Sequence, residues 1–307
     1  MMKLCFILAG LILASTILHA DENAIEIQQV TEQVYALVGK RGPMTEKDLG
    51  TNATFGVIVT SSSVVLVDPG ASFKGAKRLH DKIREITDKH VTHVINTGSE
   101  DQRWLGNGYF KQKGAQIIAL KAAVEDQQAR TNQMLTRLSF LLKESGAAGT
   151  DAVYADQVFE KEHTFNVGGI KIVLQYLGTA YTPGDIIVWL PENSVLFSGD
   201  IITVERMPAI GSMSNTSNWI DAIQQILTIN PRYIVPGHGH VADINKVNQE
   251  ILAYLVSLRK SVSAMIAEGG DLSEVSEIDQ SAFKHLIGFE MLRGRNAHQV
   301  YQELEWQ

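Results

Sequence analysis

The feature that most restricts the fold of this chain is a polar loop at residues 96–107, with the sequence Asn-Thr-Gly-Ser-Glu-Asp-Gln-Arg-Trp-Leu-Gly-Asn. The residues just before it, Val-Thr-His-Val-Ile at 91–95, are rich in β-branched side chains and predict a short strand. Gly106 and Gly108 then interrupt the chain before Tyr109. A strand that ends in charged residues places them at one edge of a sheet, so we expect the functional site there.

Hydrophobic periodicity predicts strands and helices on both sides of this loop. In the first half, strands are predicted at 25–38 (an opening pair), 52–59, 64–67 and 116–120, and helices at 73–88 and 124–144. In the second half, strands are predicted at 165–167, 170–174, 185–190 and 194–198, and helices at 219–227 and 247–266. This pattern favours an α/β fold in which two sheets pack on each other between helical layers.

Residues 1–20 differ from the rest of the chain and predict a secretory signal peptide. Lys3 gives a positive start, residues 4–18 carry no charge, and Leu-His-Ala precedes an acidic pair. The apolar run is shorter than the roughly 20 residues that a membrane-spanning helix needs. We therefore expect an exported, periplasmic protein. An uncleaved anchor is the alternative, because Leu18 is larger than the residues that favour cleavage.

The mature chain, residues 21–307, would contain no cysteine, because the single one, Cys5, leaves with the signal peptide. Disulfides and cysteine metal ligands are then excluded. Loss of Lys3 from the 27 basic residues leaves 26 against 34 acidic residues, a formal net charge of −8 that argues against nucleic acid as a partner. Since no Pro-, Gly- or Ser-rich linker divides it, we predict one domain with a helical extension from about residue 247 and no membrane span after cleavage.

Five short motifs at predicted strand ends resemble those of one known family. They are Asp-Pro-Gly at 68–70, the loop at 96–107, Gly-Thr-Ala-Tyr-Thr-Pro-Gly-Asp at 178–185, Phe-Ser-Gly-Asp at 197–200 and Pro-Gly-His-Gly at 236–239. Their order and form resemble the motif set of the metallo-β-lactamase superfamily. The resemblance implies a four-layer αββα sandwich and, in typical members, a hydrolytic centre with two zinc ions.

Most ligand positions of such a centre are replaced in this chain. By resemblance, the first metal would be held at Gly98, Glu100 and Tyr181, and the second at Gln102, Arg103, Asp200 and His238. Glycine has no donor, glutamine is a weak neutral donor, and arginine cannot lose its proton. Because zinc sites need several imidazole or carboxylate ligands, the sequence predicts no cofactor, with one zinc ion as the alternative.

Arg103 suggests a physical replacement for the metal. The predicted pocket residues are Glu100, Gln102, Arg103, Tyr181 and Asp68. We expect the Arg103 guanidinium to project into this pocket and to balance Asp200 and Glu100, since an unpaired buried carboxylate is costly. Tyr181 would hydrogen-bond the same cluster. For Asp68, capping of the loop after its strand is favoured over support of a metal ligand, because residue 98 is a glycine.

Other chemistries would use the same residues. Asp200, His238 and Glu100 would hold the single metal of a hydrolase, with Tyr181 stabilising the developing charge. Glu100, Asp101 and Asp200 would suit calcium or magnesium, which accept carboxylate ligands, although the positive charge at Arg103 opposes this. Glu100 and Asp200 would also serve as a metal-free acid and base pair.

The remaining residues near the motifs have simpler interpretations. His238 is expected to be structural and hydrogen-bonded to Asp200, with metal binding as the alternative, and His240 is expected to be a solvated loop residue. An apolar groove for a small molecule or peptide is predicted from Met207, Ile210 and Met213 together with the helix at 124–144.

The C-terminal run at 296–305, Asn-Ala-His-Gln-Val-Tyr-Gln-Glu-Leu-Glu, resembles the ending of an exported subgroup of the superfamily that is linked to sulfur-oxidation and quinoprotein systems. With the replaced ligands, it favours an exported pseudoenzyme that acts as a non-catalytic binding or accessory protein. The alternative is a hydrolase of the superfamily that works with one metal. The ligand and the oligomeric state stay open.

Overall fold

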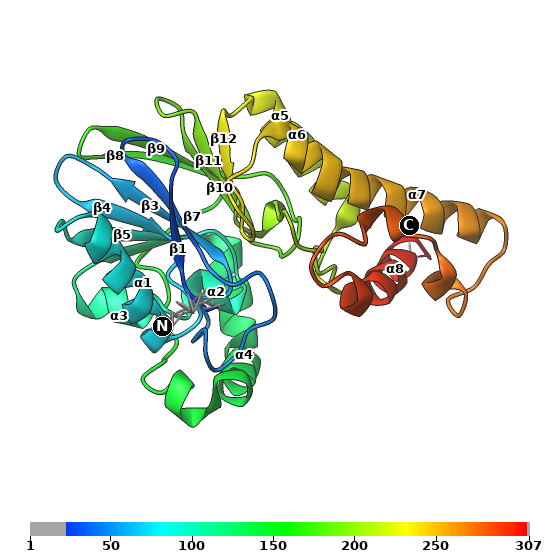
Figure 1. Ribbon diagram of the computed structural model, residues 1–307, viewed down its shortest axis with the longest axis horizontal. Helices are drawn as coiled ribbons and strands as arrows, with labels where there is room; N and C mark the ends of the chain where they lie inside the picture. Colours follow the sequence, from blue (N-terminus) through cyan, green and yellow to red (C-terminus); the bar gives the residue numbers. More distant parts are fainter. Residues whose placement is uncertain (1–22, 306–307) are drawn as a thin grey trace, which may run out of the picture.

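Two β-sheets form the centre of the computed structural model, which describes residues 23–305; the predicted signal peptide at 1–20 lies outside the described residues. Within this range, one sheet has seven strands in the order β1 to β7, and the other has five in the order β12-β11-β10-β9-β8 (Figure 1). The first comprises β1 (Glu26–Gln29), β2 (Val34–Val38), β3 (Thr54–Val59), β4 (Val64–Val67), β5 (Val91–Asn96), β6 (Gln116–Leu120) and β7 (Gln157–Phe159). The second comprises β8 (Glu162–Val167), β9 (Ile170–Tyr176), β10 (Ile186–Leu190), β11 (Val195–Phe197) and β12 (Tyr233–Val235).

The facing sides of the sheets share one apolar core. Val65 and Val67 of β4 pack in the same buried cluster as Val188 and Leu190 of β10. The intervening residues of β4 and β10 are also apolar, because helices cover the outer faces as well. This double burial explains why the central strands carry continuous hydrophobic runs.

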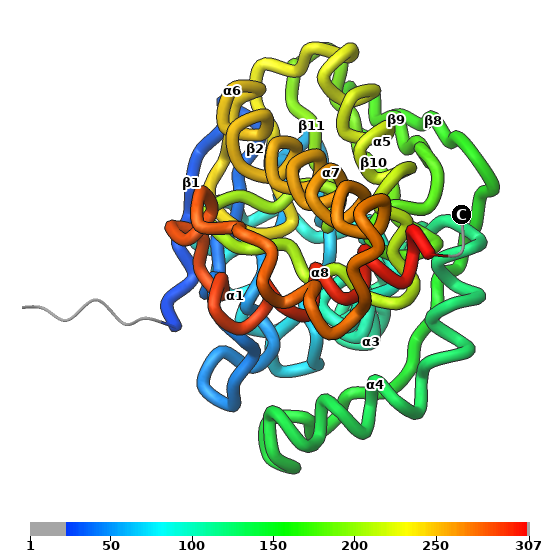
Figure 2. The backbone as a smooth tube through the Cα atoms, turned by 90° about the vertical axis from the view of Figure 1, so that its right-hand side faces the viewer, coloured from blue at the N-terminus to red at the C-terminus, as the bar shows by residue number. Residues whose placement is uncertain are grey.

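Helices cover both outer faces. They are α1 (Phe73–Ile86), α2 (Asp101–Trp104), α3 (Asn107–Gln112), α4 (Lys121–Ala147), α5 (Thr216–Ile229), α6 (Ile244–Val247), α7 (Ala253–Ala267) and α8 (Phe289–Glu305). Leu79 of α1 packs on the first sheet, whereas Trp219 of α5 and Leu255 of α7 pack on the second. Figure 2, viewed from the right-hand side of Figure 1, shows α7 and α8 in front of the sandwich, where the two helices pack on each other. The predicted αββα layering is confirmed.

Parallel strand pairs bring the sequence motifs to one edge of the sandwich. β4 pairs with β5 in parallel, with Val67 opposite Ile95. β11 pairs with β12 in parallel, with Phe197 opposite Val235. The chain therefore leaves neighbouring strands at the same level, and the motifs that follow them form adjacent loops.

Some element boundaries differ from the prediction. The loop at 96–107 contains α2 and the start of α3, because burial of Asp101, Arg103 and Trp104 favours a helical turn that propensity alone does not indicate. The predicted helix at 247–266 begins earlier, with α6 and a π-helical turn at Asn248–Leu252 before α7. The three-residue strands β7 and β12 were not predicted, since runs this short carry little periodicity.

Shorter helical turns complete the described chain, at Gly199–Ile201, Val275–Glu277 and Ser281–Phe283. Across residues 23–305, no helix combines the length and the apolar character that crossing a membrane requires.

Candidate functional site

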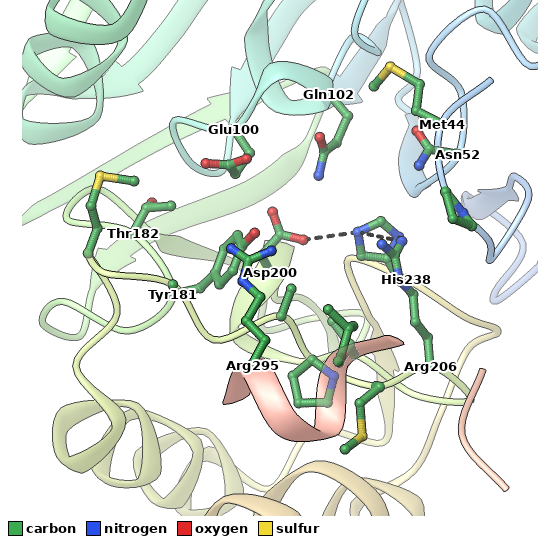
Figure 3. A pocket seen from close by; sticks show the side chains of 18 of the residues that line it. Met44, Asn52, Glu100, Gln102, Tyr181, Thr182, Asp200, Arg206, His238 and Arg295 are labelled. Atoms are coloured by element: carbon green, nitrogen blue, oxygen red, sulfur yellow. Dashed lines mark hydrogen bonds and ion pairs between the residues drawn. The ribbon is translucent and has the colours of Figure 1, made fainter. Parts of the chain in front are cut away.

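A cavity of about 510 Å³ opens at the motif edge of the sandwich, between the strand-end loops, α4 and α8 (Figure 3). Five of the residues singled out in the sequence line it: Glu100, Gln102, Tyr181, Asp200 and His238. Arg103 and Asp68 do not line it. Their side chains are only 0% and 2% exposed and lie beneath the cavity, so Arg103 pairs with Asp200 as expected but does not reach the cavity surface.

Arg103 is fully engaged in this buried position. Its Nε and Nη2 donate to the two carboxylate oxygens of Asp200 at 2.9 and 2.7 Å. Its Nη1 donates to Asp68 Oδ2 at 2.9 Å and to the Thr54 carbonyl at 3.3 Å, and Nη2 also donates to the Gly237 carbonyl at 3.0 Å. All five N–H groups of the guanidinium thus have an acceptor.

These contacts connect the two sheets. Thr54 and Asp68 belong to β3 and the end of β4 in the first sheet, whereas Asp200 and Gly237 follow strands of the second. The Thr54 backbone N–H also donates to the Gly237 carbonyl at 2.8 Å. Residue 237 must be glycine for this approach, because a Cβ there would lie 2.5 Å from the Gly199 carbonyl oxygen and 2.7 Å from Arg103 Nη2. Arg103 is therefore a polar clamp across the sandwich.

Asp68 bonds Arg103 and also caps a neighbouring loop. Its φ of 65° turns the chain sharply at the end of β4. Its carboxylate accepts hydrogen bonds from the Thr97 backbone N–H at 2.8 Å and the Thr97 hydroxyl at 2.7 Å. Asp68 thus caps the loop after β5, the neighbouring strand, rather than the loop after its own strand.

The two carboxylates share Arg103 unequally. Burial raises the pKa of Asp68 to about 6, even though Arg103 and Thr97 oppose this rise. Burial acts in the same direction on Asp200, but the charge of Arg103 outweighs it and holds the Asp200 pKa far below its ordinary value. The geometry explains the difference, because Asp200 has two guanidinium contacts and Asp68 has one. Asp200 therefore stays ionised to a lower pH than Asp68 does.

His238 connects Asp200 to a further arginine. Its Nε2 lies 3.3 Å from Asp200 Oδ1, and its Nδ1 lies 2.8 Å from Arg206 Nη1 (Figure 3). Because Arg206 can only donate, Nδ1 is the acceptor and Nε2 carries the proton toward Asp200. Burial and the Arg206 charge lower the His238 pKa to about 4. The ring is therefore neutral and both of its nitrogens are engaged.

The neutral state of His238 gives a pH prediction. Between about pH 6.5 and pH 4 the unfolded chain would bind a proton here that the folded chain does not, so stability falls as pH falls through this window. From pH 7 to pH 5, wild type should lose about 2 kcal/mol more than His238→Gln. Urea denaturation at both pH values measures this difference, and parallel losses in the two proteins would contradict it.

The acidic residues of the loop have other partners. Glu100 accepts a hydrogen bond from Arg130 Nη1 of α4 at 3.0 Å, and Asp101 forms an ion pair with Arg137 of the same helix. Burial raises the pKa of both Glu100 and Asp101. Glu100 is consequently balanced by Arg130, and the expectation that Arg103 balances it is wrong.

Tyr181 and Gln102 face the cavity without protein partners. Within residues 23–305, neither the Tyr181 hydroxyl nor the Gln102 side-chain amide forms a hydrogen bond, so Tyr181 does not bond the Asp200 cluster as expected. Burial raises the Tyr181 pKa well above its ordinary value, and the phenol stays protonated. His240 also differs from the expectation of a solvated loop residue: it is half-buried, 2.9 Å from Glu205 and 3.1 Å from Glu26.

The apolar groove was predicted in part. Met207 and Met213 line the cavity, as do Met134 and Leu141 of α4, but Ile210 is fully buried behind the wall. Sequence reasoning missed Arg206 and Arg295, which also line the cavity, because nothing in their local sequence marks them as site residues.

The C-terminal motif has a structural role at this wall. Asn296 of α8 is fully buried; its Oδ1 accepts from the Ile210 N–H at 2.9 Å, and its Nδ2 donates to the Pro208 carbonyl at 2.7 Å. Glu303 accepts hydrogen bonds from the first residues of α5, including Thr216, and pairs with Arg259 of α7. The run at 296–305 therefore fixes α8 against the loop that forms the cavity wall.

The donor set does not fit the zinc centre that the family resemblance implies. Both oxygens of Asp200 bond Arg103, and both nitrogens of His238 are engaged. Residue 98 is a glycine and offers no donor, and a Cβ there would lie 2.9 Å from Asp185 Oδ1, so a side chain at this position would have to displace that carboxylate. Among residues 23–305, no group of three His, Cys, Asp or Glu side chains is arranged to hold a metal ion.

Comparisons with known proteins agree with the fold. A metallo-β-lactamase type 2 from Bacteroides fragilis is 24% identical over 278 residues, 84% of this chain and 100% of that protein. A metallo-β-lactamase from Pontibacter korlensis has a similar structure, with a TM-score of 0.61 and 18% identity over 76% of this chain and 99% of that chain. A stereoselective inverting sec-alkylsulfatase from Pseudomonas sp. has a TM-score of 0.69 and 16% identity over 92% of this chain and 50% of that chain.

The family described as "Metallo-beta-lactamase superfamily" matches residues 49–238, a range that runs from before the motif at Asp68 to His238 of the last motif. With the αββα layers and the loops at their shared edge, this match identifies the chain as a member of the metallo-β-lactamase superfamily.

Proposed function

We propose that this protein is a metal-independent binding or accessory protein, whose cavity takes a small molecule and whose ancestral metal position is filled by the Arg103 clamp. One observation carries the proposal: a guanidinium with all its donors satisfied bonds both oxygens of Asp200, the residue that would bridge two metals by family resemblance. A cation would have to displace this arginine from a site where Asp68, Thr54 and Gly237 also hold it.

The energetics support the clamp as a stable state. Burial alone would lower the Arg103 pKa, but the charges of Asp200 and Asp68 outweigh it and raise the pKa above its ordinary value. The positive charge is therefore permanent, and it repels a second cation at the same carboxylates. Buried ion pairs persist where geometry and hydrogen bonding are nearly complete, as they are here.

Export belongs to the same proposal. Its basis is the signal-peptide pattern at residues 1–20, and membership of the exported sulfur-oxidation subgroup rests on the resemblance of residues 296–305. An accessory role outside the cytoplasm would suit a binding cavity of this size, which lies within the range of small-molecule sites.

Zinc uptake tests the proposal directly. Mature protein, purified without chelator, incubated with zinc and dialysed, should contain close to no zinc by elemental analysis. His285 is exposed and far from the strand-end motifs in sequence, so His285→Ala is the matched control for His238→Ala. A zinc-to-protein ratio near one that is lost in His238→Ala and kept in His285→Ala would overturn the proposal in favour of a single-metal hydrolase.

Turnover assays complete the test. Wild type should hydrolyse generic β-lactam, ester and thioester substrates no faster than Asp200→Ala and His238→Ala do. Hydrolysis that both substitutions abolish would identify an enzyme.

A further inference from the structure

We propose that the ligand of this cavity is an anionic amphiphile, a small molecule with one negatively charged head group and an apolar body. The inference rests on the proposed function, since it names the chemical class that the metal-free cavity would bind. Its basis is a pair of guanidinium groups at the cavity wall. Arg206 and Arg295 both line the cavity, and neither has a carboxylate partner within residues 23–305 (Figure 3).

The other charged side chains of the lining already have partners. Arg103 holds both Asp200 and Asp68, and Arg130 holds both Glu100 and Asp126. Arg137 pairs with Asp101. Arg206 and Arg295 are the lining guanidinium groups, among residues 23–305, whose N–H donors no carboxylate accepts, so these two are left to bond a ligand.

Arg206 has the greater need of an anionic partner, because it is a partly buried cation with few acceptors. It is half-buried, and only its Nη1 finds an acceptor among the described residues, the neutral Nδ1 of His238 at 2.8 Å. Burial lowers the Arg206 pKa, which reflects the cost of keeping this cation in a partly dry site. A ligand carboxylate or sulfo group would offset that cost and would accept two parallel N–H bonds from a guanidinium.

Arg295 approaches from a different element. It extends from α8 toward the centre of the cavity, on the side away from Arg206 and His238 in Figure 3. The helix that carries it is fixed by Asn296, which bonds the Pro208 carbonyl and the Ile210 N–H. Two guanidinium groups therefore face one cavity from anchored segments.

Neutral polar groups are available beside them. The protonated Tyr181 hydroxyl and the Gln102 amide face the cavity without protein partners. Unpartnered buried polar groups are costly, so a ligand head group that satisfies them gains affinity.

Part of the lining is apolar and adaptable. It includes Met44, Met134, Met207, Met213, Met291 and Leu141. Methionine side chains are flexible and polarisable, and they suit an aliphatic or aromatic body without a fixed shape. A fully polar anion would leave these apolar side chains in contact with water, so the lining favours an amphiphile.

The test compares ligands that share one tail and differ in the head group. Protein dialysed against EDTA is titrated by calorimetry at low ionic strength with octanoate, octyl sulfate, octyltrimethylammonium and 1-octanol, each below its micelle concentration. The anions should bind at least about tenfold more tightly than the cation and the alcohol. Arg206→Gln and Arg295→Gln should each weaken octanoate binding by about tenfold.

Arg293→Gln is the matched control, because Arg293 lies on the same helix, pairs with Glu290 and does not line the cavity. Equal binding of octanoate and 1-octanol, no binding of any probe, or equal losses in Arg293→Gln and Arg295→Gln would overturn the inference. The zinc-to-protein ratio distinguishes a failure of this inference from a failure of the proposed function. Anion binding that appears only after zinc is restored would overturn both.

Discussion

Arg103→Ala should lower the free energy of unfolding by about 3–5 kcal/mol, and the melting temperature by about 10 °C. The substitution removes the only cation that contacts both Asp200 and Asp68 within the described residues. Two carboxylates, 5% and 2% exposed, would then lie close together with no cation bonded to either, because His238, which contacts Asp200, is neutral. It also releases the carbonyls of Thr54 and Gly237, which weakens the link between the sheets.

Two further variants separate the charge from the volume of the side chain. Arg103→Met keeps much of the volume and should still lose most of the stability, because the carboxylates stay unpaired. Glu100→Ala should cost less than about 1 kcal/mol, since Glu100 is partly exposed and Arg130 keeps its ion pair with Asp126. Chemical denaturation of all three proteins at pH 7 measures the series. If Arg103→Ala had the same melting temperature as wild type, the stabilising role of the Arg103 clamp would be contradicted.

The layers of the fold could be predicted from the sequence because they depend on repeating patterns. Strands such as β3 and β4 are continuous apolar runs bounded by polar turns, and α1 repeats its apolar residues every three or four positions. The motifs then placed Asp68, Asp200 and His238 at strand ends that parallel pairing brings together. β7 and β12, with three residues each, escaped prediction, whereas β11 of the same length was predicted as part of the longer run at 194–198.

The candidate site could be predicted in composition but not in geometry. The sequence indicated that Arg103 would pair with the buried carboxylates. How far Arg103 lies below the cavity depends on the separation of the two sheets, which no local sequence pattern contains. The sequence predicted that Arg103 also balances Glu100, because the actual partner of Glu100, Arg130, lies 30 residues away on α4 and no local pattern pairs the two. Arg206 and Arg295 were missed for the same reason: a cavity wall built from distant segments leaves no sequence periodicity.

Asp200→Asn should destabilise the protein by about 3 kcal/mol, with no change when EDTA is present. The substitution keeps the shape of the side chain but removes the charge that bonds Arg103 Nε and Nη2 and accepts from His238 Nε2. The new amide nitrogen would point its N–H donors at the guanidinium, which has no acceptor. Arg103 would then rely on Asp68, whose single contact holds it less firmly.

The sign of this effect distinguishes a clamp from an empty metal site. In a metal-binding cluster without its ion, carboxylates repel one another, so removing one charge is neutral or stabilising. Here the charge is already paired, and its removal must be unfavourable. Because Arg103 depresses the Asp200 pKa, the difference between wild type and Asp200→Asn should be constant from about pH 7 to pH 5 and shrink only below about pH 4. Glu100→Gln is the matched control, with a small effect at every pH. If Asp200→Asn were more stable than wild type in EDTA, Arg103 would not occupy the position that the structure assigns to it.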